Sequence, residues 1–159
     1  DNLVAKLNKL DLNTYTAPVW NLLEITEGFV QLNEQTSGEY VPQMLNLQAI
    51  NGISFTKGCY LGQETVARMQ YLGKNKRALF SLTANTDKPF SPDEVIEKQL
   101  GDNWRKAGDI LASYQSDDGH CYLQAVLGSD VDETIQLRLK SQPEIKVALQ
   151  PLPYSLITD

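Results

Sequence analysis

Residues 108–127, GDILASYQSDDGHCYLQAVL, contain the pattern that decides the predicted fold. Two runs rich in strand-forming residues, 108–114 and 120–127, flank the sequence Asp117-Asp118-Gly119. Acidic residues followed by glycine between two such runs are typical of a tight β-hairpin. The stretch therefore predicts two paired antiparallel strands.

Further short strands are predicted on both sides of this hairpin. They cover residues 78–83, 95–100, 134–139 and 145–149, and turn residues such as Lys88-Pro89 and Gly101-Asp102-Asn103 separate them. Six short strands at this spacing predict a small antiparallel β-barrel. We expect the barrel to begin near residues 73–76.

The sequence before the barrel predicts a mixture of helices and one strand. Apolar residues at helical spacing indicate a short helix within residues 1–10, and 61–72 has the same periodicity with Gly73 as a stop. Residues 19–25, VWNLLEI, are rich in strand formers and indicate a strand. The predicted fold class is therefore α+β.

Net charge argues against broad nucleic-acid binding. The chain carries 14 basic and 20 acidic side chains, a formal charge of −6, which repels a phosphate backbone. Residues 57–77 depart from this average, with five basic residues against Glu64 alone. This segment suits a small anion or an acidic partner, although a solvated basic face is the alternative.

The sequence also indicates a compartment. It holds no apolar run of the ~18 residues that a bilayer requires, and its beginning, DNLVAKLNKL, has no export signal. The two cysteines, Cys59 and Cys121, and the single histidine, His120, lack metal-ligand or disulfide spacing. We expect a cytoplasmic protein without a membrane or metal site. The missing initiator methionine favours a processed chain or a fragment.

Cys59 is the candidate reactive group. It lies between Gly58 and Gly62 in a turn just before the helix predicted over 61–72, with Lys57 nearby. A helix N-terminus and a neighbouring cation both lower the pKa of a thiol. The alternative is that Cys59 is a small buried apolar residue.

The motif around Cys59 resembles that of a known family. Residues 57–64, KGCYLGQE, followed by Arg68, match the signature K-G-C-[YF]-x-G-Q-E-x-x-x-R of the YgfZ family, folate-binding relatives of the glycine-cleavage aminomethyltransferase. The similarity extends to NLQAI at 46–50, GISF at 52–55, NKRAL at 75–79 and PLPYSL at 151–156, so that it covers nearly the whole chain.

The resemblance implies fold and cofactor. Residues 1–75 would form part of a ferredoxin-like, folate-binding region, and 76–159 the C-terminal β-barrel. Trp20 matches the family's folate-contacting tryptophan, and the cofactor would be tetrahydrofolate or another reduced folate. Full-length members have a large N-terminal portion, so the chain resembles a C-terminal half whose missing N-terminal half would be a partner.

The resemblance also implies a function. The protein would support the assembly or repair of iron–sulfur clusters in client enzymes, including the one that methylthiolates a tRNA adenosine. Cys59 would be the functional residue, with Lys57, Gln63, Glu64 and Arg68 around it. A non-enzymatic folate-dependent helper without strong nucleic-acid binding is favoured.

Two alternatives remain open. A tetrahydrofolate-dependent aminomethyltransferase would use the same fold and cofactor, but such enzymes lack the KGCYLGQE string. The second alternative is direct RNA binding through the basic segment 57–77 and its Tyr60 and Tyr71. The acidic net charge argues against RNA binding.

Overall fold

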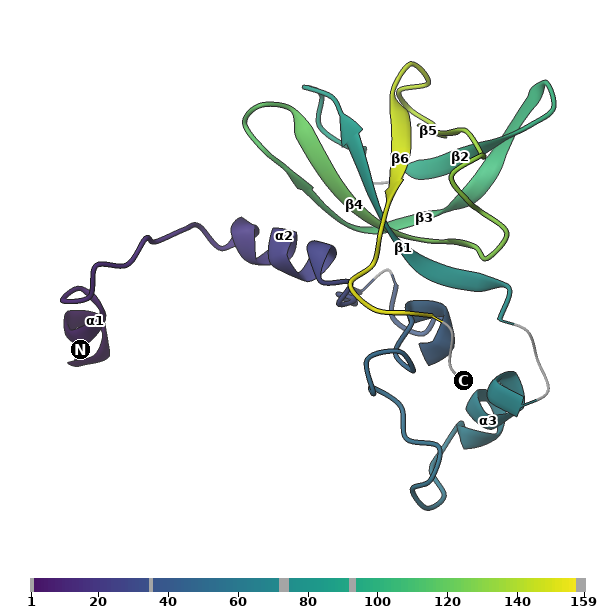
Figure 1. Cartoon of the computed structure of the whole chain (residues 1–159), viewed down its shortest axis with the longest axis horizontal. Helices are drawn as coiled ribbons and strands as arrows, with labels where there is room; N and C mark the ends of the chain where they lie inside the picture. The colour runs from purple at the N-terminus through teal and green to yellow at the C-terminus, as the bar shows by residue number, and fades with distance from the viewer. Residues whose placement is uncertain (1, 35, 72–74, 92–93, 157–159) are drawn as a thin grey trace.

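The computed structural model describes residues 2–34, 36–71, 75–91 and 94–156 (Figure 1). Within these ranges a group of helices precedes a β-barrel. The elements in chain order are α1 (Asn2–Leu7), α2 (Pro18–Thr26), the 3-10 helix η1 (Pro42–Leu45), α3 (Gln63–Tyr71), β1 (Arg77–Asn85), β2 (Val95–Leu100), β3 (Asn103–Gln115), β4 (His120–Gly128), β5 (Leu137–Leu139) and β6 (Lys146–Gln150).

The six strands form a closed antiparallel barrel in the order β1-β4-β3-β2-β5-β6. This confirms the predicted α+β class with a small six-stranded barrel. Alternate side chains point inward and make a closed apolar core. Its fully buried members include Ile96, Leu123, Ala125, Leu127 and Leu139.

Gly108 of β3 leaves no room for a side chain against β4. A Cβ atom there would lie 1.9 Å from the Val126 carbonyl oxygen, so only glycine fits. The β2–β3 hairpin turns at Gly101 and Asp102, so β3 begins at Asn103, five residues before the predicted start.

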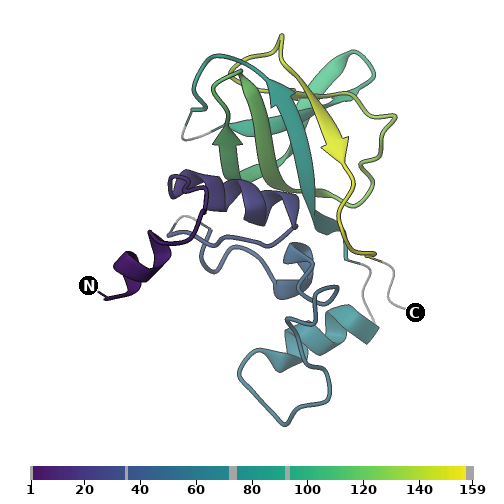
Figure 2. The same ribbon diagram turned by 60° about the vertical axis from the view of Figure 1, so that its left-hand side comes forward.

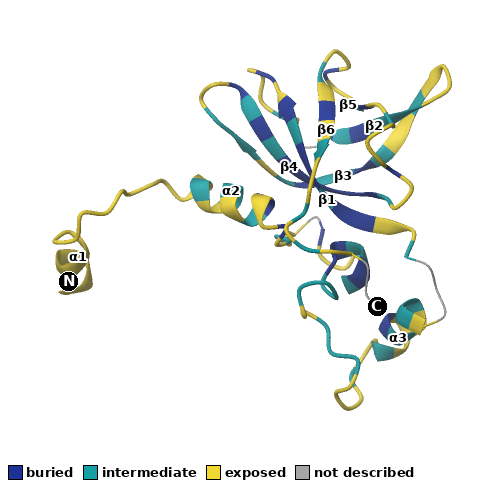
Figure 3. Cartoon of the chain, in the orientation of Figure 1, coloured by how far each residue is buried: buried dark blue, intermediate teal, exposed yellow. Residues whose placement is uncertain are grey.

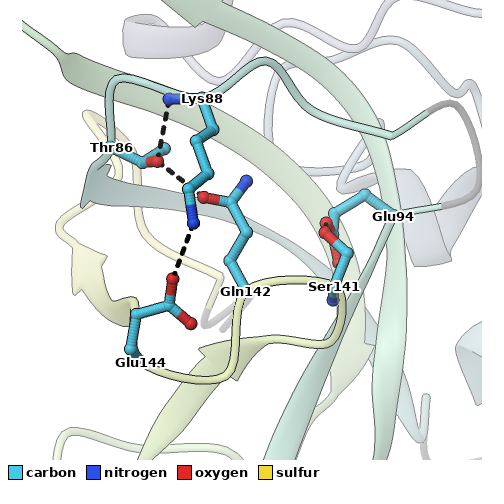
Figure 4. Close-up of polar contacts among 6 residues, drawn as sticks. All are labelled: Thr86, Lys88, Glu94, Ser141, Gln142 and Glu144. Atoms are coloured by element: carbon cyan, nitrogen blue, oxygen red, sulfur yellow. Dashed lines mark hydrogen bonds and ion pairs between the residues drawn. The ribbon is translucent and has the colours of Figure 1, made fainter.

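Polar side chains tie together the loops at one end of the barrel (Figure 4). Thr86 donates a hydrogen bond from Oγ1 to Oε1 of Gln142 at 2.6 Å, and Ser141 donates to the buried Glu94 through its N–H and its hydroxyl. Lys88 and Glu144 form an exposed ion pair at 3.2 Å. These contacts join the segment after β1 and the start of β2 to the β5–β6 loop.

Residues 19–25 form most of α2, so the strand predicted there is wrong. Pro18 starts the helix, where its missing N–H costs nothing. A short apolar run cannot be assigned to strand or helix by periodicity alone. Ile25 is buried on the barrel side of α2, whereas Trp20 and Leu23 are exposed.

The end of α2 is held by three side chains of the barrel and its C-terminal tail. Ser81 donates a hydrogen bond to the Ile25 carbonyl, Gln124 to the Phe29 carbonyl and Tyr154 to the Gly28 carbonyl, each at 2.9 Å. The Ile25 carbonyl lies in the last turn of α2, where carbonyl groups need external donors, and the other two lie just after the helix. Figure 2 shows α2 lying against the barrel, where it contacts β3 and β4.

Asn46 joins the helical region to β1. Its side chain donates to the Leu79 carbonyl at 2.8 Å and accepts from the Leu79 N–H at 3.2 Å. It also donates to the Tyr154 hydroxyl at 3.4 Å. Asn46 is 1% exposed and has a φ of 58°, a left-handed conformation that asparagine tolerates better than most residues.

The helix predicted over 61–72 is present as α3. It begins at Gln63 because Gly62, at a φ of 87°, ends the preceding turn in the left-handed region. The side chain of Gln43 donates to the Val66 carbonyl at 2.7 Å and so ties η1 to α3. Leu72, the last residue of the predicted helix, and the Gly73 stop lie outside the described residues.

The region before the barrel buries few of its apolar side chains (Figure 3): among its described residues only Ile25, Leu45 and Val66 are buried hydrophobics. The predicted N-terminal helix is confirmed as α1, but it buries no residue. The described residues before Arg77 form helices and turns and no strand. The ferredoxin-like sheet and the division at residues 75 and 76 therefore stay predictions.

Candidate functional site

The Cys59 thiol is exposed in the loop that leads into α3. The loop leaves the GISF segment, passes Gly58 and enters the helix after Gly62. The Gly62 carbonyl accepts the N–H of Val66 at 3.4 Å, the first backbone bond of the helical turn. The alternative of a buried structural cysteine is thus wrong for this residue.

Gln63 fixes the backbone next to the thiol. Its Oε1 accepts the Tyr60 N–H at 3.0 Å, while its own N–H donates to the Tyr60 carbonyl at 3.2 Å. Such a reciprocal pair satisfies two backbone groups at a helix start, as in a capping box. The role that the geometry gives to Gln63 is to hold the Cys59 loop against α3.

Lys57 lies over an aromatic ring of the same loop. Its Nζ is 4.6 Å from the centroid of Tyr60, a cation–π distance, and its N–H donates to the Ser54 hydroxyl at 3.2 Å. The ammonium group therefore stays close to the motif and adds positive charge beside the exposed thiol.

A hollow of about 370 Å³ gathers most of the predicted site residues. Four of them line it, namely Lys57, Cys59, Gln63 and Glu64. The remaining lining residues are Ser54, Phe55, Gly58, Tyr60 and Ala67. Ala67 was not predicted, although its spacing of four from Gln63 places both on one helix face.

Arg68 does not line this hollow. It forms the predicted i,i+4 pair with Glu64 at 3.1 Å, and the two side chains are 69% and 84% exposed. An exposed pair of this kind stabilises a helix by about 0.2–0.5 kcal/mol. Arg68 therefore presents its charge to solvent beside the hollow.

Trp20 is on a different element and is not part of the hollow. Its indole is 64% exposed on α2, and its Nε1 donates to Oε1 of Glu24 at 2.9 Å. An exposed indole face fits the stacking of a pterin ring. Because the indole N–H is already bonded to Glu24, the part of Trp20 that is open to a ligand is its ring face. That face fits one stacking wall of a folate site.

Cys121 differs from Cys59 in its access to solvent. It has no exposed surface and lies in β4, with Sγ 3.4 Å from the Gly119 carbonyl oxygen. Burial raises the pKa of the Cys121 thiol, which keeps it in the unreactive protonated form.

The described part of the chain contains neither a metal-binding cluster nor a membrane-spanning helix. Among residues 2–34, 36–71, 75–91 and 94–156, no group of three or more His, Cys, Asp or Glu could hold a metal ion. In the same ranges no helix has the length and apolar character needed to cross a bilayer.

Comparison with known proteins identifies similar sequences. Residues 75–142 match the family model described as YgfZ, beta-barrel domain. The tRNA-modifying protein YgfZ of Colwellia psychrerythraea is 67% identical over 157 residues, which cover 99% of this chain and 48% of the relative.

Proteins of the same name from Yersinia pestis and Yersinia pseudotuberculosis are each 46% identical over 140 residues. These matches cover 88% of this chain and 42% of each relative. The chain therefore spans about half the length of the curated relatives it matches.

Proposed function

Since the chain belongs to the YgfZ family, we propose that it acts in tRNA modification through the exposed thiol of Cys59. The relatives are named as tRNA-modifying proteins, and this chain shares 67% of its residues with one of them over 157 positions. In the proposal it is a folate-binding helper of iron–sulfur enzymes, including a tRNA methylthiotransferase, and does not itself modify RNA.

The observation that carries this proposal is the hollow around Cys59. An exposed thiol with Lys57, Gln63 and Glu64 along the same hollow is accessible to a partner protein. Of the charged side chains lining the hollow, Glu64 already pairs with Arg68, and Lys57 faces the Tyr60 ring. Cys59 is thus the group left for chemistry with a client enzyme or its cluster.

Folate binding is the second part of the proposal. The exposed indole of Trp20 would stack on the pterin of a reduced folate, and α2 is fixed to the barrel through Ser81, Gln124 and Tyr154. A bound folate supplies a one-carbon carrier to the protein. The chain's own contribution is to hold one wall of that site in place.

The thiol is tested by expressing the chain in bacteria that lack their own family member. The fraction of methylthiolated adenosine in tRNA is measured by mass spectrometry for wild type, Cys59→Ser and Cys121→Ser. We expect wild type and Cys121→Ser to restore the modification and Cys59→Ser to lose it. Full restoration by Cys59→Ser would contradict the proposal.

Folate binding is tested by titrating 5-formyltetrahydrofolate into the chain while following tryptophan fluorescence. The chain has two tryptophans, so Trp104→Phe is the matched control for Trp20→Phe. We expect saturable quenching in wild type and Trp104→Phe that is lost in Trp20→Phe. Quenching that persists in Trp20→Phe would remove Trp20 from the site.

A further inference from the structure

Strand β6 continues beyond its short pairing with β5. On one side, Ala148, Leu149 and Gln150 of β6 pair with β1. On the other side, β6 pairs with β5 through Val147 and Lys146 alone. Among the described residues, no strand pairs with 148–150 on the side away from β1. The backbone of β6 is therefore a short open strand edge at this position.

A cleft of about 730 Å³ lies along this edge. Its apolar lining includes Ile135, Leu137, Val147 and Leu149, and Trp104 of β3 lines it as well. An open strand edge beside apolar side chains has the features that bind an extended peptide, because the edge offers hydrogen bonds and the apolar surface accepts alternate side chains.

The charges of the cleft favour a basic peptide. Arg138 is already neutralised by Glu97, with Nη2 2.8 Å from Oε2, and its guanidinium stacks 4.0 Å from the Trp104 ring centroid. Glu144 is paired with Lys88. The other charged side chains that line the cleft are Lys146 and two carboxylates, Asp132 and Glu133. The carboxylates outnumber the ammonium group.

The two carboxylates extend the site beyond the cleft. Asp132 and Glu133 also line a neighbouring hollow of about 320 Å³ that includes Phe80, Pro151 and Leu152. The acidic pair thus lies between two hollows, each with apolar lining. This arrangement matches a strand in which apolar and basic residues alternate.

We propose that the cleft between β5 and β6 binds an extended peptide segment of a partner protein, with apolar side chains on Leu149 and Ile135 and a basic side chain at Asp132 and Glu133. The peptide adds to the open edge of β6. The site is separate from the Cys59 hollow and shares no lining residue with it.

The test uses the whole chain with Trp20→Phe, so that Trp104 is its only tryptophan. The probe is acetyl-Val-Lys-Val-Lys-Val-Lys-amide, and acetyl-Val-Glu-Val-Glu-Val-Glu-amide is its acidic counterpart. We expect a saturable change in Trp104 fluorescence with the basic peptide that weakens as salt is raised. We expect Glu133→Lys to weaken binding about tenfold and Glu133→Gln to weaken it less.

The matched control is Asp117→Lys, the same charge reversal at an exposed residue in the β3–β4 turn. It should leave the affinity within about twofold of the parent. Equal binding of the acidic peptide, no saturable change, or equal effects of Glu133→Lys and Asp117→Lys would overturn the proposal. Self-association that Glu133→Lys abolishes would assign the cleft to a second copy of the chain and would overturn it as well.

Discussion

The barrel and the region before it differ in where their apolar side chains lie. Within the described residues, Ile25, Leu45 and Val66 are the buried hydrophobic residues that precede β1, and all the others belong to β1 and the segments after it. The exposed large hydrophobic residues show the opposite distribution. Most of them lie between Leu3 and Leu32, on α1, α2 and their connecting segments.

This difference shows that the two regions are stabilised in different ways. The barrel buries its own closed core, whereas α2 and η1 depend on contacts with the barrel. These contacts are an outer apolar cluster of Leu45, Leu79, Leu111 and Val126 and the polar contacts of Ser81, Gln124, Asn46 and Tyr154. The proposed thiol and folate sites lie in the region with the smaller core. Binding loops commonly belong to the parts of a protein with low local stability.

The two cysteines give the largest expected contrast between the regions. In the native chain, we expect iodoacetamide to label Cys59 at least about a thousandfold faster than Cys121, which reacts only after the barrel opens. Mass spectrometry of Cys59→Ser and Cys121→Ser over time measures each rate. Similar rates would show that the barrel core is open.

A leucine substitution in each region tests the difference in burial. Leu123→Ala removes a side chain with no exposed surface and should lower the free energy of unfolding by about 2–5 kcal/mol. Leu61→Ala, at a residue that is 104% exposed, should change it by less than about 0.5 kcal/mol. Urea denaturation measures both, and comparable losses would refute the contrast.

Asn46→Ala tests the junction between the regions. The substitution leaves the N–H and C=O of Leu79 without their side-chain partners and should cost about 2 kcal/mol or more. Asn51→Ala is the matched control, since Asn51 has a similar φ of 57° but is exposed. Asn51→Ala should lose only the tolerance of asparagine for the left-handed conformation, which lowers the free energy of unfolding by about 1 kcal/mol.

If both variants lost the same stability in urea, the junction would add nothing beyond its backbone conformation. Limited proteolysis gives a second reading of the same variants. Cleavage within α2 should accelerate in Asn46→Ala and not in Asn51→Ala, because only the first variant loses a contact with Tyr154.

Acid should weaken the barrel slightly. The Thr134 hydroxyl, followed by the Thr134 N–H, holds the pKa of Asp132 below its ordinary value of 3.8. A carboxyl group whose pKa is lower in the folded than in the unfolded state stabilises the fold at pH values above its ordinary pKa. This contribution is lost as the pH falls below that pKa. The urea midpoint of Asp132→Asn should therefore decline less steeply than that of wild type below pH 3.8. Equal slopes would contradict this.

Sequence reasoning worked best where the structure is local. The alternating strands from 78 onward and the turn at Asp117-Asp118-Gly119 were predicted because strand periodicity and turn chemistry are written in neighbouring residues. The KGCYLGQE motif led to the family, which the comparisons confirm. It also collected most of the residues that line the Cys59 hollow.

The misses come from tertiary contacts. Residues 19–25 were predicted as a strand because their composition cannot show that the barrel would bind the end of a helix through Ser81, Gln124 and Tyr154. The roles of Asn46 and Tyr154 were missed for the same reason, since they are separated by more than one hundred residues. The open edge of β6 depends on which strands pair, and sequence alone does not give that pairing.

Hydrogen exchange of the whole chain, followed by mass spectrometry of its peptides, tests most directly whether a self-supporting barrel carries the functional region. We expect the slowest amide exchange in β1, β3 and β4, and exchange approaching that of an unfolded peptide in α1 and the Cys59 loop, with α2 between them. Equal protection across the chain, or faster exchange in the barrel strands than in α2, would contradict this account.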